Sequence, residues 1–313
     1  MPENRDDIDF EGWDLHRAAR DDRIDIARSL IARGDDIEVK DNDNWTPLHW
    51  AAYKNSLDVV RLLIKHGADI EAKDNDNWTP LHWAAYKNSL DVVQILIEKG
   101  ADIEAKSNNG ATPLQVAAGH NSIEVATLLI DSNVDIEVKS KIGWTPLHVA
   151  AVNNSLEVVK LLIERDAYIQ AKNDDGQTPL HHAAWKNSIN IATLLIEHGA
   201  DIETKDNDDR TSLHVAANKN SIDVARLLIE RGAEIEAKSN TRWTPLHLAA
   251  QKDSLAVGKL LIENGADIDA MNKYGHTSRH WVMGSLEELS LNSLISNMML
   301  IRNSDSHKYE TQP

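Results

Sequence analysis

The sequence predicts an all-α repeat solenoid, in which copies of one short helical unit stack in a row. The first observation is a near-perfect repeat, because residues 74–106 copy residues 41–73 with only four changes. The second is that the same 33-residue frame recurs along the chain. Five regular copies, three altered copies and one earlier copy make nine repeats in one register. The third is the hydrophobic spacing inside each copy, which is typical of short amphipathic helices. The block Thr-Pro-Leu-His begins at Thr46, Thr79, Thr145, Thr178 and Thr244.

Each repeat opens with a short helix. In the second repeat, Thr46 is placed to cap this helix and Pro47 to occupy its first turn, where a missing N–H costs nothing. The apolar residues Leu48, Ala51 and Ala52 follow at helical spacing and form a thin stripe. The paired alanines predict close approach of a neighbouring helix.

A second helix completes the repeat. Asn55 suits a left-handed C-cap for the first helix, and we expect the side chain of Ser56 to cap the second. The apolar face of the second helix runs over residues 57–64, and Gly67 ends it. Such a unit cannot bury its hydrophobic face alone, so each repeat needs its neighbours.

The residue two positions before the Thr lies in the turn of the repeat. It is glycine in three of the regular repeats, whereas the other four carry Asn44, Asn77, Asp209 or Arg242. Asparagine and aspartate tolerate positive φ, but arginine does so poorly. We therefore expect the turn at Arg242 to be the least favourable.

A 33-residue period with the pattern TPLHxAA resembles the ankyrin repeat, over residues 11–301. The resemblance implies a β-hairpin-like turn followed by two antiparallel helices, in an elongated, curved array that binds proteins without chemistry of its own. We expect five segments: a frayed acidic N-terminus (1–10), an N-terminal capping repeat (11–43), regular repeats (44–274), a degenerate C-terminal capping repeat (275–301) and a disordered tail (302–313).

Composition restricts the possible partners. A net charge of −17 argues against binding to nucleic acid or anionic membranes, and no apolar run is long enough to cross a bilayer. The absence of cysteine suits a reducing compartment. The first ten residues lack the pattern of a secretory signal. We expect a monomer that acts in a cytoplasm, its own or that of a host cell.

Three recurring patterns resemble chemical sites, but each has a simpler structural interpretation. A histidine column is better explained by hydrogen bonds around the turn than by a metal ladder, since adjacent copies lie a whole repeat apart. The run at residues 41–44 lacks the later ligands of a calcium loop, which leaves it as an exposed turn. Columns of Glu and Lys, which begin at Glu38 and Lys40, are interpreted as solvated charges. The histidines are His16, His49, His82, His148, His181, His214, His247 and His280.

No nucleophile elbow, phosphate-binding loop or zinc-protease motif occurs, so we expect no enzyme, no cofactor and no metal site. Three functional classes remain. The chain is a scaffold for a partner protein, an acidic decoy for a basic surface, or a self-assembling rod. The near-identity of two repeats indicates recent duplication, and such arrays resemble those of intracellular bacteria, which predicts a host-directed effector.

The resemblance places the binding site on the concave side, at the turn tips and the first helices. Exposed Trp and Tyr are enriched at binding hot spots, and six of them crowd into the second and third repeats. The alternative is that each Trp only covers its neighbour's turn; Trp45 and Trp78 favour binding, because packing does not require an aromatic residue at a tip. The candidate residues are Asp43, Trp45, Trp50, Tyr53, Lys54, Asp76, Trp78, Trp83, Tyr86, Lys87, Trp144, Trp185, Lys186 and Trp243.

Overall fold

The computed structural model describes residues 12–281, which fall into an N-terminal block up to Ala167 and a C-terminal block from Tyr168 onward. No strand occurs among these residues, and none of their helices is long and apolar enough to cross a bilayer. The N-terminal block contains α1 (Leu15–Arg20), α2 (Ile24–Arg33), α3 (Pro47–Lys54), α4 (Leu57–Lys65), α5 (Pro80–Tyr86), α6 (Leu90–Glu98), α7 (Pro113–Gly119), α8 (Ile123–Asp131), α9 (Pro146–Val152) and α10 (Leu156–Glu164). The C-terminal block contains α11 (Pro179–Lys186), α12 (Ile189–Glu197), α13 (Ser212–Lys219), α14 (Ile222–Glu230), α15 (Pro245–Gln251), α16 (Leu255–Glu263) and the 3-10 helix η1 (Ser278–Trp281).

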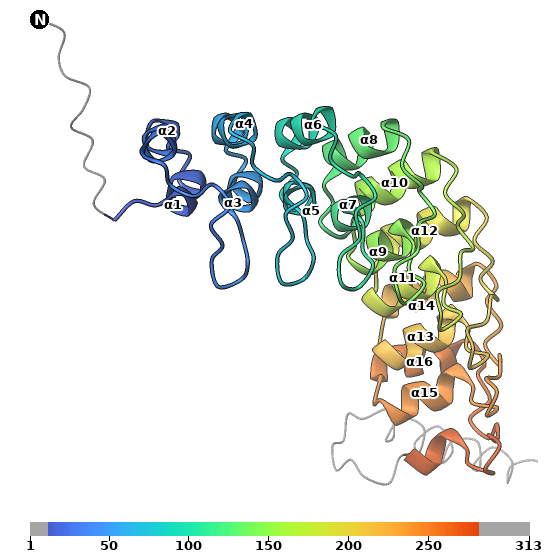
Figure 1. The fold of residues 1–313 in the computed structure, drawn as a ribbon. Helices are drawn as coiled ribbons and strands as arrows, with labels where there is room; N and C mark the ends of the chain where they lie inside the picture. Colours follow the sequence, from blue (N-terminus) through green and yellow to red (C-terminus); the bar gives the residue numbers. More distant parts are fainter. Residues whose placement is uncertain (1–11, 282–313) are drawn as a thin grey trace, which may run out of the picture. The chain divides into compact units, whose positions relative to one another are not determined.

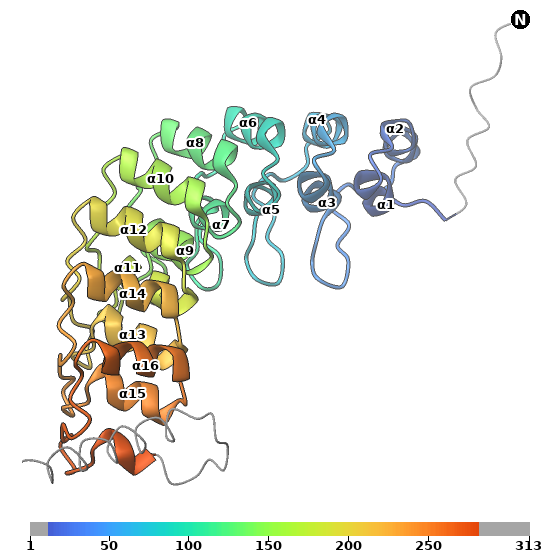
Figure 2. The ribbon, with the colours of Figure 1, turned by 180° about the vertical axis from the view of Figure 1, so that it is seen from behind.

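Each block consists of two rows of helices (Figure 1). In the N-terminal block, the first helices α1, α3, α5, α7 and α9 pack side by side, and the second helices α2, α4, α6, α8 and α10 form a second row packed against them, drawn above the first row for α2, α4 and α6. The C-terminal block repeats this arrangement, with the row α11, α13 and α15 packed against the row α12, α14 and α16. The loop before each first helix projects beyond the first row, as Figures 1 and 2 show for the loops before α3 and α5. The predicted all-α repeat solenoid is confirmed.

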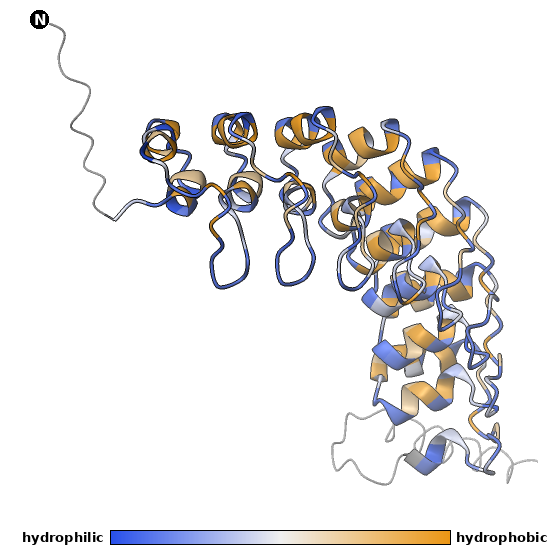
Figure 3. Cartoon of the chain, viewed as in Figure 1, coloured by the Kyte–Doolittle hydropathy of each residue, from blue (hydrophilic) through white to orange (hydrophobic). Residues whose placement is uncertain are grey.

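The core lies between the two rows. Leu48, Ala51 and Ala52 of α3 and Val60 and Leu63 of α4 are at most 1% exposed. Figure 3 shows the same division, with hydrophobic colour on the helices and hydrophilic colour along the loops. Because alanine leaves little side chain between first helices, α3 can pack closely on both α1 and α5. Each repeat therefore completes its core with its neighbours, as the sequence predicts.

The recurring histidine joins its own repeat to the next. The Thr46 N–H donates to Nδ1 of His49 over 3.1 Å, and Nε2 of His49 lies 3.1 Å from the carbonyl oxygen of Trp78 in the next repeat. A carbonyl only accepts, so Nε2 carries the proton and the ring is the neutral tautomer. The structural interpretation is confirmed here and at the other histidines whose Nε2 meets the next tip loop: His16, His82, His181, His214 and His247.

The fourth repeat shows what this position requires. Its side chain is Gln115, whose amide oxygen accepts from the Thr112 N–H over 3.1 Å and whose amide nitrogen donates to the Trp144 carbonyl over 2.6 Å. Glutamine carries no charge, so this position requires only one hydrogen-bond acceptor and one donor. In agreement, burial lowers the pKa of His49, His181 and His247, and lowers the pKa of His82 and His214 to about 4.

The turn that precedes each first helix is hairpin-like and bonded to its neighbours. We call residues 41–45 and their equivalents the tip loop. In this loop the Asp41 N–H donates to the Trp45 carbonyl over 3.0 Å. The next tip loop is held alongside, because the Asn75 N–H donates to the Asp43 carbonyl over 3.2 Å. Oδ1 of Asp41 accepts the N–H groups of Asp43 and Trp45. The Asp41 carboxylate thus organises the turn, in accord with the interpretation as a turn.

The predicted capping role of Ser56 is wrong, because its side chain makes no capping bond to α4, and four other second helices are capped from the preceding repeat. The hydroxyl oxygens of Ser56 and Ser89 are buried without a hydrogen-bond partner. Instead, Oδ1 of Asn88, at the end of α5, accepts the N–H of Val125 in α8 over 3.2 Å. Asn55 ends α3 with φ of 59°, as predicted. The same contact to the next repeat is made by Asn121, Asn187 and Asn220.

The glutamate column is wrongly predicted as solvated charge. Oε1 of Glu38 accepts the N–H of Asp69 in the next repeat over 2.8 Å, which satisfies a loop donor that no helix can pair. Burial accordingly raises the pKa of Glu38, Glu71 and Glu236. The lysines of the neighbouring column, such as Lys40, are exposed. The other glutamates bonded in this way are Glu71, Glu104, Glu203 and Glu236.

Arg242 adopts the strained turn expected of it, with φ of 59°, where Asn44 and Asp209 have φ of 61° and 59°. The C-terminal capping helix expected within 275–301 and the tail at 302–313 lie outside the described residues, apart from residues 275–281. The frayed segment 1–10 also lies outside them.

We expect replacement of His82 by glutamine to reduce the acid sensitivity of the fold. An unfolded histidine titrates near pH 6.5 and folded His82 near 4, so between these values only the unfolded state gains the proton. The stability that the protein gains by burying His82 as a neutral ring is fully present above about pH 6.5 and is lost as the pH falls towards 4. His82→Gln should match the wild type at pH 7.5 and lose less stability by pH 4.5 in urea unfolding. Exposed His66→Gln is the control, and parallel pH curves for all three proteins would contradict the expectation.

We expect Arg242→Gly to stabilise the protein by up to about 1 kcal/mol, because glycine adopts positive φ without the steric cost of a Cβ atom. Gly110→Ala is the opposite test, since its Cβ would lie 2.9 Å from the backbone nitrogen of Lys141. Thermal unfolding should move the two midpoints in opposite directions. A lower midpoint for Arg242→Gly would show that the arginine side chain stabilises its turn.

Candidate partner-binding surface

The structure gathers ten of the fourteen predicted binding residues on the second and third repeats. Trp45 and Trp78 end their tip loops, and the other aromatic residues come from α3 and α5, which pack side by side. Their six rings lie close together and are half-buried. We call Trp45, Trp50, Tyr53, Trp78, Trp83 and Tyr86 the aromatic cluster.

The rings of the cluster interlock across the two repeats. The centroid of Trp83 lies 4.3 Å from that of Trp45 in the preceding repeat and 4.5 Å from that of Trp78 in its own. Trp50 is 4.6 Å from Trp45. Tyr53 meets Trp83 edge to face, at 5.7 Å and 79°. Such tilted and edge-on contacts are the favoured geometries of aromatic pairs.

Hydrogen bonds hold the two inner tryptophans. The indole N–H of Trp50 donates to Oδ2 of Asp41 over 2.9 Å, and that of Trp83 donates to Oδ2 of Asp74 over the same distance. The other oxygen of each carboxylate is already bonded to tip-loop N–H groups. Each aspartate therefore fixes both a turn and an indole ring, which leaves the cluster little freedom to rearrange.

The structure overturns the idea that packing does not require Trp45. Its ring touches Trp83 of the next repeat, so it spans the groove between repeats, which is the contact of the alternative interpretation. The rings of the cluster are nevertheless only half-buried. They take part in the packing of the repeats and keep part of their surface in solvent.

Charged side chains border the cluster. Nζ of Lys87 lies 4.5 Å from the centroid of Tyr53 and 5.4 Å from that of Tyr86, and Nζ of Lys54 lies 5.1 Å from Tyr53. These are cation–π distances, which hold the ammonium groups at the edge of the rings. The predicted rim residues Asp43 and Asp76 are exposed on the tip loops. A partner would meet aromatic surface between cations and carboxylates.

The other four predicted residues do not join the cluster in the same way. Trp144 is half-buried on the fifth repeat, beyond the aromatic-poor fourth repeat. The remaining three belong to the C-terminal block. There Trp185 is 46% exposed beneath Nζ of Lys219 at 3.4 Å, Lys186 is exposed, and Trp243 is half-buried against His247.

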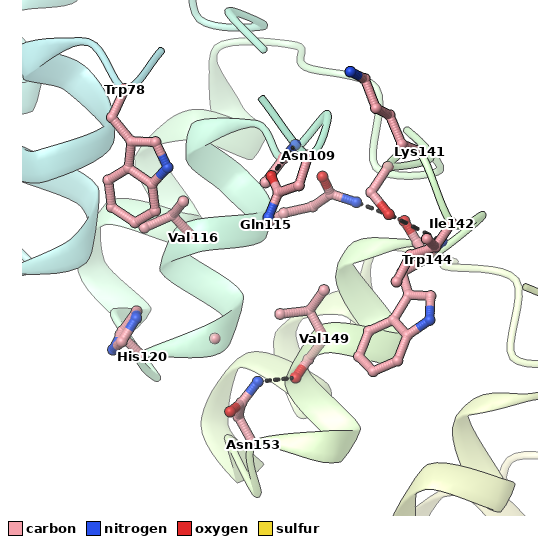
Figure 4. A pocket seen from close by; sticks show the side chains of 13 residues that line it. Trp78, Asn109, Gln115, Val116, His120, Lys141, Ile142, Trp144, Val149 and Asn153 are labelled. Carbon is pink, nitrogen blue, oxygen red and sulfur yellow. Dashed lines mark hydrogen bonds between the residues drawn. The ribbon is translucent and has the colours of Figure 1, made fainter. Parts of the chain in front are cut away.

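A pocket on the third to fifth repeats was missed by sequence reasoning (Figure 4). Its volume is about 360 Å³, and Trp78 and Trp144 stand on opposite sides of it. Val116 and Val149 point into the space between them, and Gly119 leaves it open. The polar lining residues are Asn109, Gln115, His120, Ser140, Lys141 and Asn153.

A column-by-column comparison of the repeats would have revealed this pocket. Where the third repeat has Trp78, Trp83 and Tyr86, the fourth has Ala, Val and Gly at residues 111, 116 and 119. The loss of three rings from one repeat, between repeats that keep a tip tryptophan, leaves the space. The positions of the aromatic residues alone do not indicate the pocket, because the pocket arises where the fourth repeat lacks them.

The described residues offer no metal chemistry. No group of three or more His, Asp or Glu side chains within 12–281 could hold an ion. The two ring nitrogens of His49 and of His82 are engaged by backbone groups, and burial keeps these rings neutral. These histidines therefore act in structure.

Comparison with known proteins gives the same result as the geometry. The family described as ankyrin repeats (3 copies) matches residues 15–107, 104–173, 168–239 and 203–272. The crystal structure of the human ASB11 ankyrin repeat domain is similar, with a TM-score of 0.64 and 27% identity over 71% of this chain and 99% of that one. A sequence search of curated proteins finds no match. The family match extends over most of the chain and agrees with the two-helix repeats and the hairpin-like tip loops. This chain therefore belongs to the ankyrin-repeat family.

Proposed function

We propose that the chain is a non-catalytic scaffold that binds a partner protein through the aromatic cluster, on the concave face of the array. Ankyrin repeats are generally protein-interaction modules and typically non-catalytic, which supports the general role. The observation that carries the specific proposal is the cluster itself. Six interlocked rings stay half-exposed at the tip loops and first helices of two neighbouring repeats, in a chain of net charge −17.

The physical case rests on preorganisation. Large aromatic side chains supply most of the energy at binding hot spots. Flexible side chains lose entropy when a partner immobilises them, at about 0.5–1.5 kcal/mol each. Trp50 and Trp83 are already held by Asp41 and Asp74, and Trp45 is packed on Trp83, so this cost is largely met on folding. The cluster can therefore convert buried ring area into affinity efficiently.

The charged border would orient the partner. Lys54 and Lys87 lie on the helix side of the rings, and Asp43 and Asp76 lie on the tip loops. A complementary partner presents apolar side chains to the rings, carboxylates to the two lysines and cations to the two aspartates. The setting we propose is cytoplasmic, as a monomer, and the near-identical second and third repeats support the further proposal of a host-directed bacterial effector.

We expect a Tyr53→Ala, Tyr86→Ala double variant to lose the partner. Each substitution removes a half-exposed ring and should weaken binding by about 1–3 kcal/mol. The partner is captured from a host-cell lysate by the wild type, identified by mass spectrometry, purified and titrated calorimetrically against each protein. Because these rings also pack, thermal unfolding must show that the variant is folded at the titration temperature.

The matched control is Tyr168→Ala, Tyr274→Ala, which removes two tyrosines that are 63% and 65% exposed in the C-terminal block. It should bind as the wild type does. Equal affinity of all three proteins would refute the cluster as the site. An affinity that falls steeply between low and moderate salt would instead favour the acidic decoy, and concentration-dependent light scattering of the pure chain would favour the rod.

A further inference from the structure

We infer that the pocket between Trp78 and Trp144 receives one indole side chain of the partner, with a carboxylate beside it in the partner's sequence. This inference rests on the proposed function and makes it specific. It assigns to the fourth repeat, which lacks aromatic residues, the selection of the partner.

The neighbouring repeats show what fits the pocket. In the third repeat, the ring of Trp83 is held by two tip tryptophans, with centroids at 4.3 and 4.5 Å. The fourth repeat has the small side chain of Val116 in that register, while Trp78 still stands on one side. Trp144 closes the other side. A partner's indole would thus occupy the kind of space that the chain fills with its own indole one repeat earlier.

The lining suits a ring that is apolar on its faces and polar at one edge. Val116 and Val149 offer methyl groups to the ring faces. Gln115 is committed to backbone carbonyl groups and does not compete. The Asn153 amide nitrogen donates to the Val149 carbonyl over 2.9 Å, which leaves its amide oxygen as an acceptor for an indole N–H. The volume of about 360 Å³ is large enough for one bicyclic ring.

The charges favour a carboxylate next to that ring. None of the thirteen lining residues is acidic, although the chain has 50 Asp and Glu against 33 Lys and Arg. Lys141 is exposed on the pocket rim. His120 also lines the pocket, with its ring centroid 3.9 Å from that of Tyr86 in a tilted contact. Burial, and secondly the charge of nearby Lys87, lowers the pKa of His120. At physiological salt the Debye length is about 8 Å, so Lys141 at the rim acts on a bound carboxylate more strongly than charges farther away.

An exposed apolar side chain adjoins the pocket. Ile142 is 58% exposed on the tip loop that precedes Trp144, and it lines the opening. It would cover the backbone of a partner segment once the indole is inserted. Pocket and rim together form a continuous surface with the aromatic cluster, because Trp78 belongs to both.

The test uses three capped tetrapeptides, acetyl-Gly-Trp-Asp-Gly-amide and its counterparts with Ala for Trp or Lys for Asp. Binding to the full chain is followed through the NMR signals of the Trp78 and Trp144 indole N–H groups. We expect saturable shifts at millimolar concentration with the Trp-Asp peptide, binding at least threefold weaker with Trp-Lys, and none with Ala-Asp. Equal shifts with all three peptides would overturn the inference.

Val116→Trp fills the pocket with the residue that the second and third repeats carry in this register, so the fold already accommodates it. It should abolish binding of the Trp-Asp peptide. Val215→Trp makes the same change in the same register of the C-terminal block and should leave binding unchanged. Lys141→Glu is the second variant, and it should reverse the preference for Asp over Lys without altering the core. Undiminished binding to Val116→Trp, or an unchanged preference in Lys141→Glu, would refute the assignment.

The captured partner separates this inference from the proposed function. If the partner is lost by both Val116→Trp and the Tyr53→Ala, Tyr86→Ala double variant, both stand. If only the double variant loses it, the cluster binds the partner and the pocket does not. If only Val116→Trp loses it, the pocket is the site and the cluster is structural.

Discussion

The fold depends on the bond that each repeat makes to the next. A first helix of six to eight residues is too short to be stable alone, and its companion helix buries its apolar face only against neighbours. The imidazole of the Thr-Pro-Leu-His block caps its own helix with one nitrogen and reaches the next tip loop with the other. One neutral side chain thus sets both the start of a helix and the position of the following turn.

The fold was predictable because its signals are local and repeated. The Thr-Pro start, the Asn end with positive φ and the paired alanines each state a preference of a few residues, and nine copies make the register unmistakable. The failures share one cause. Ser56 and Glu38 were assigned from their own repeat, whereas the groups that decide their roles belong to the repeat alongside. A single sequence gives spacing within a repeat but not which atoms meet between repeats.

The candidate site was predictable to a similar depth. Its members were found because Trp and Tyr are easily recognised in a sequence, and six of these residues are indeed brought together on two repeats. Their packing was misjudged, since Trp45 rests on a ring 38 residues away. The pocket was not predicted because a small residue, taken alone, does not indicate a binding site. Ala111, Val116 and Gly119 become informative only beside the aromatic residues that occupy their places elsewhere.

The asparagine that ends one first helix and caps a later second helix has a consequence for how such a chain changes length. Oδ1 of Asn88 belongs to one copy and the N–H of Val125 to the next, and Asn121 of that next copy bonds Val158 in turn, so a copy between two others supplies half of two junctions. Duplication of 33 residues therefore supplies one new asparagine acceptor and one new second-helix N–H donor, wherever in the repeat the duplicated segment begins. An insertion of another size would leave the N–H of such a second helix without its asparagine acceptor. Recombination can add or remove whole copies without passing through a misfolded ancestor, which is how residues 74–106 could arise from residues 41–73 in one step.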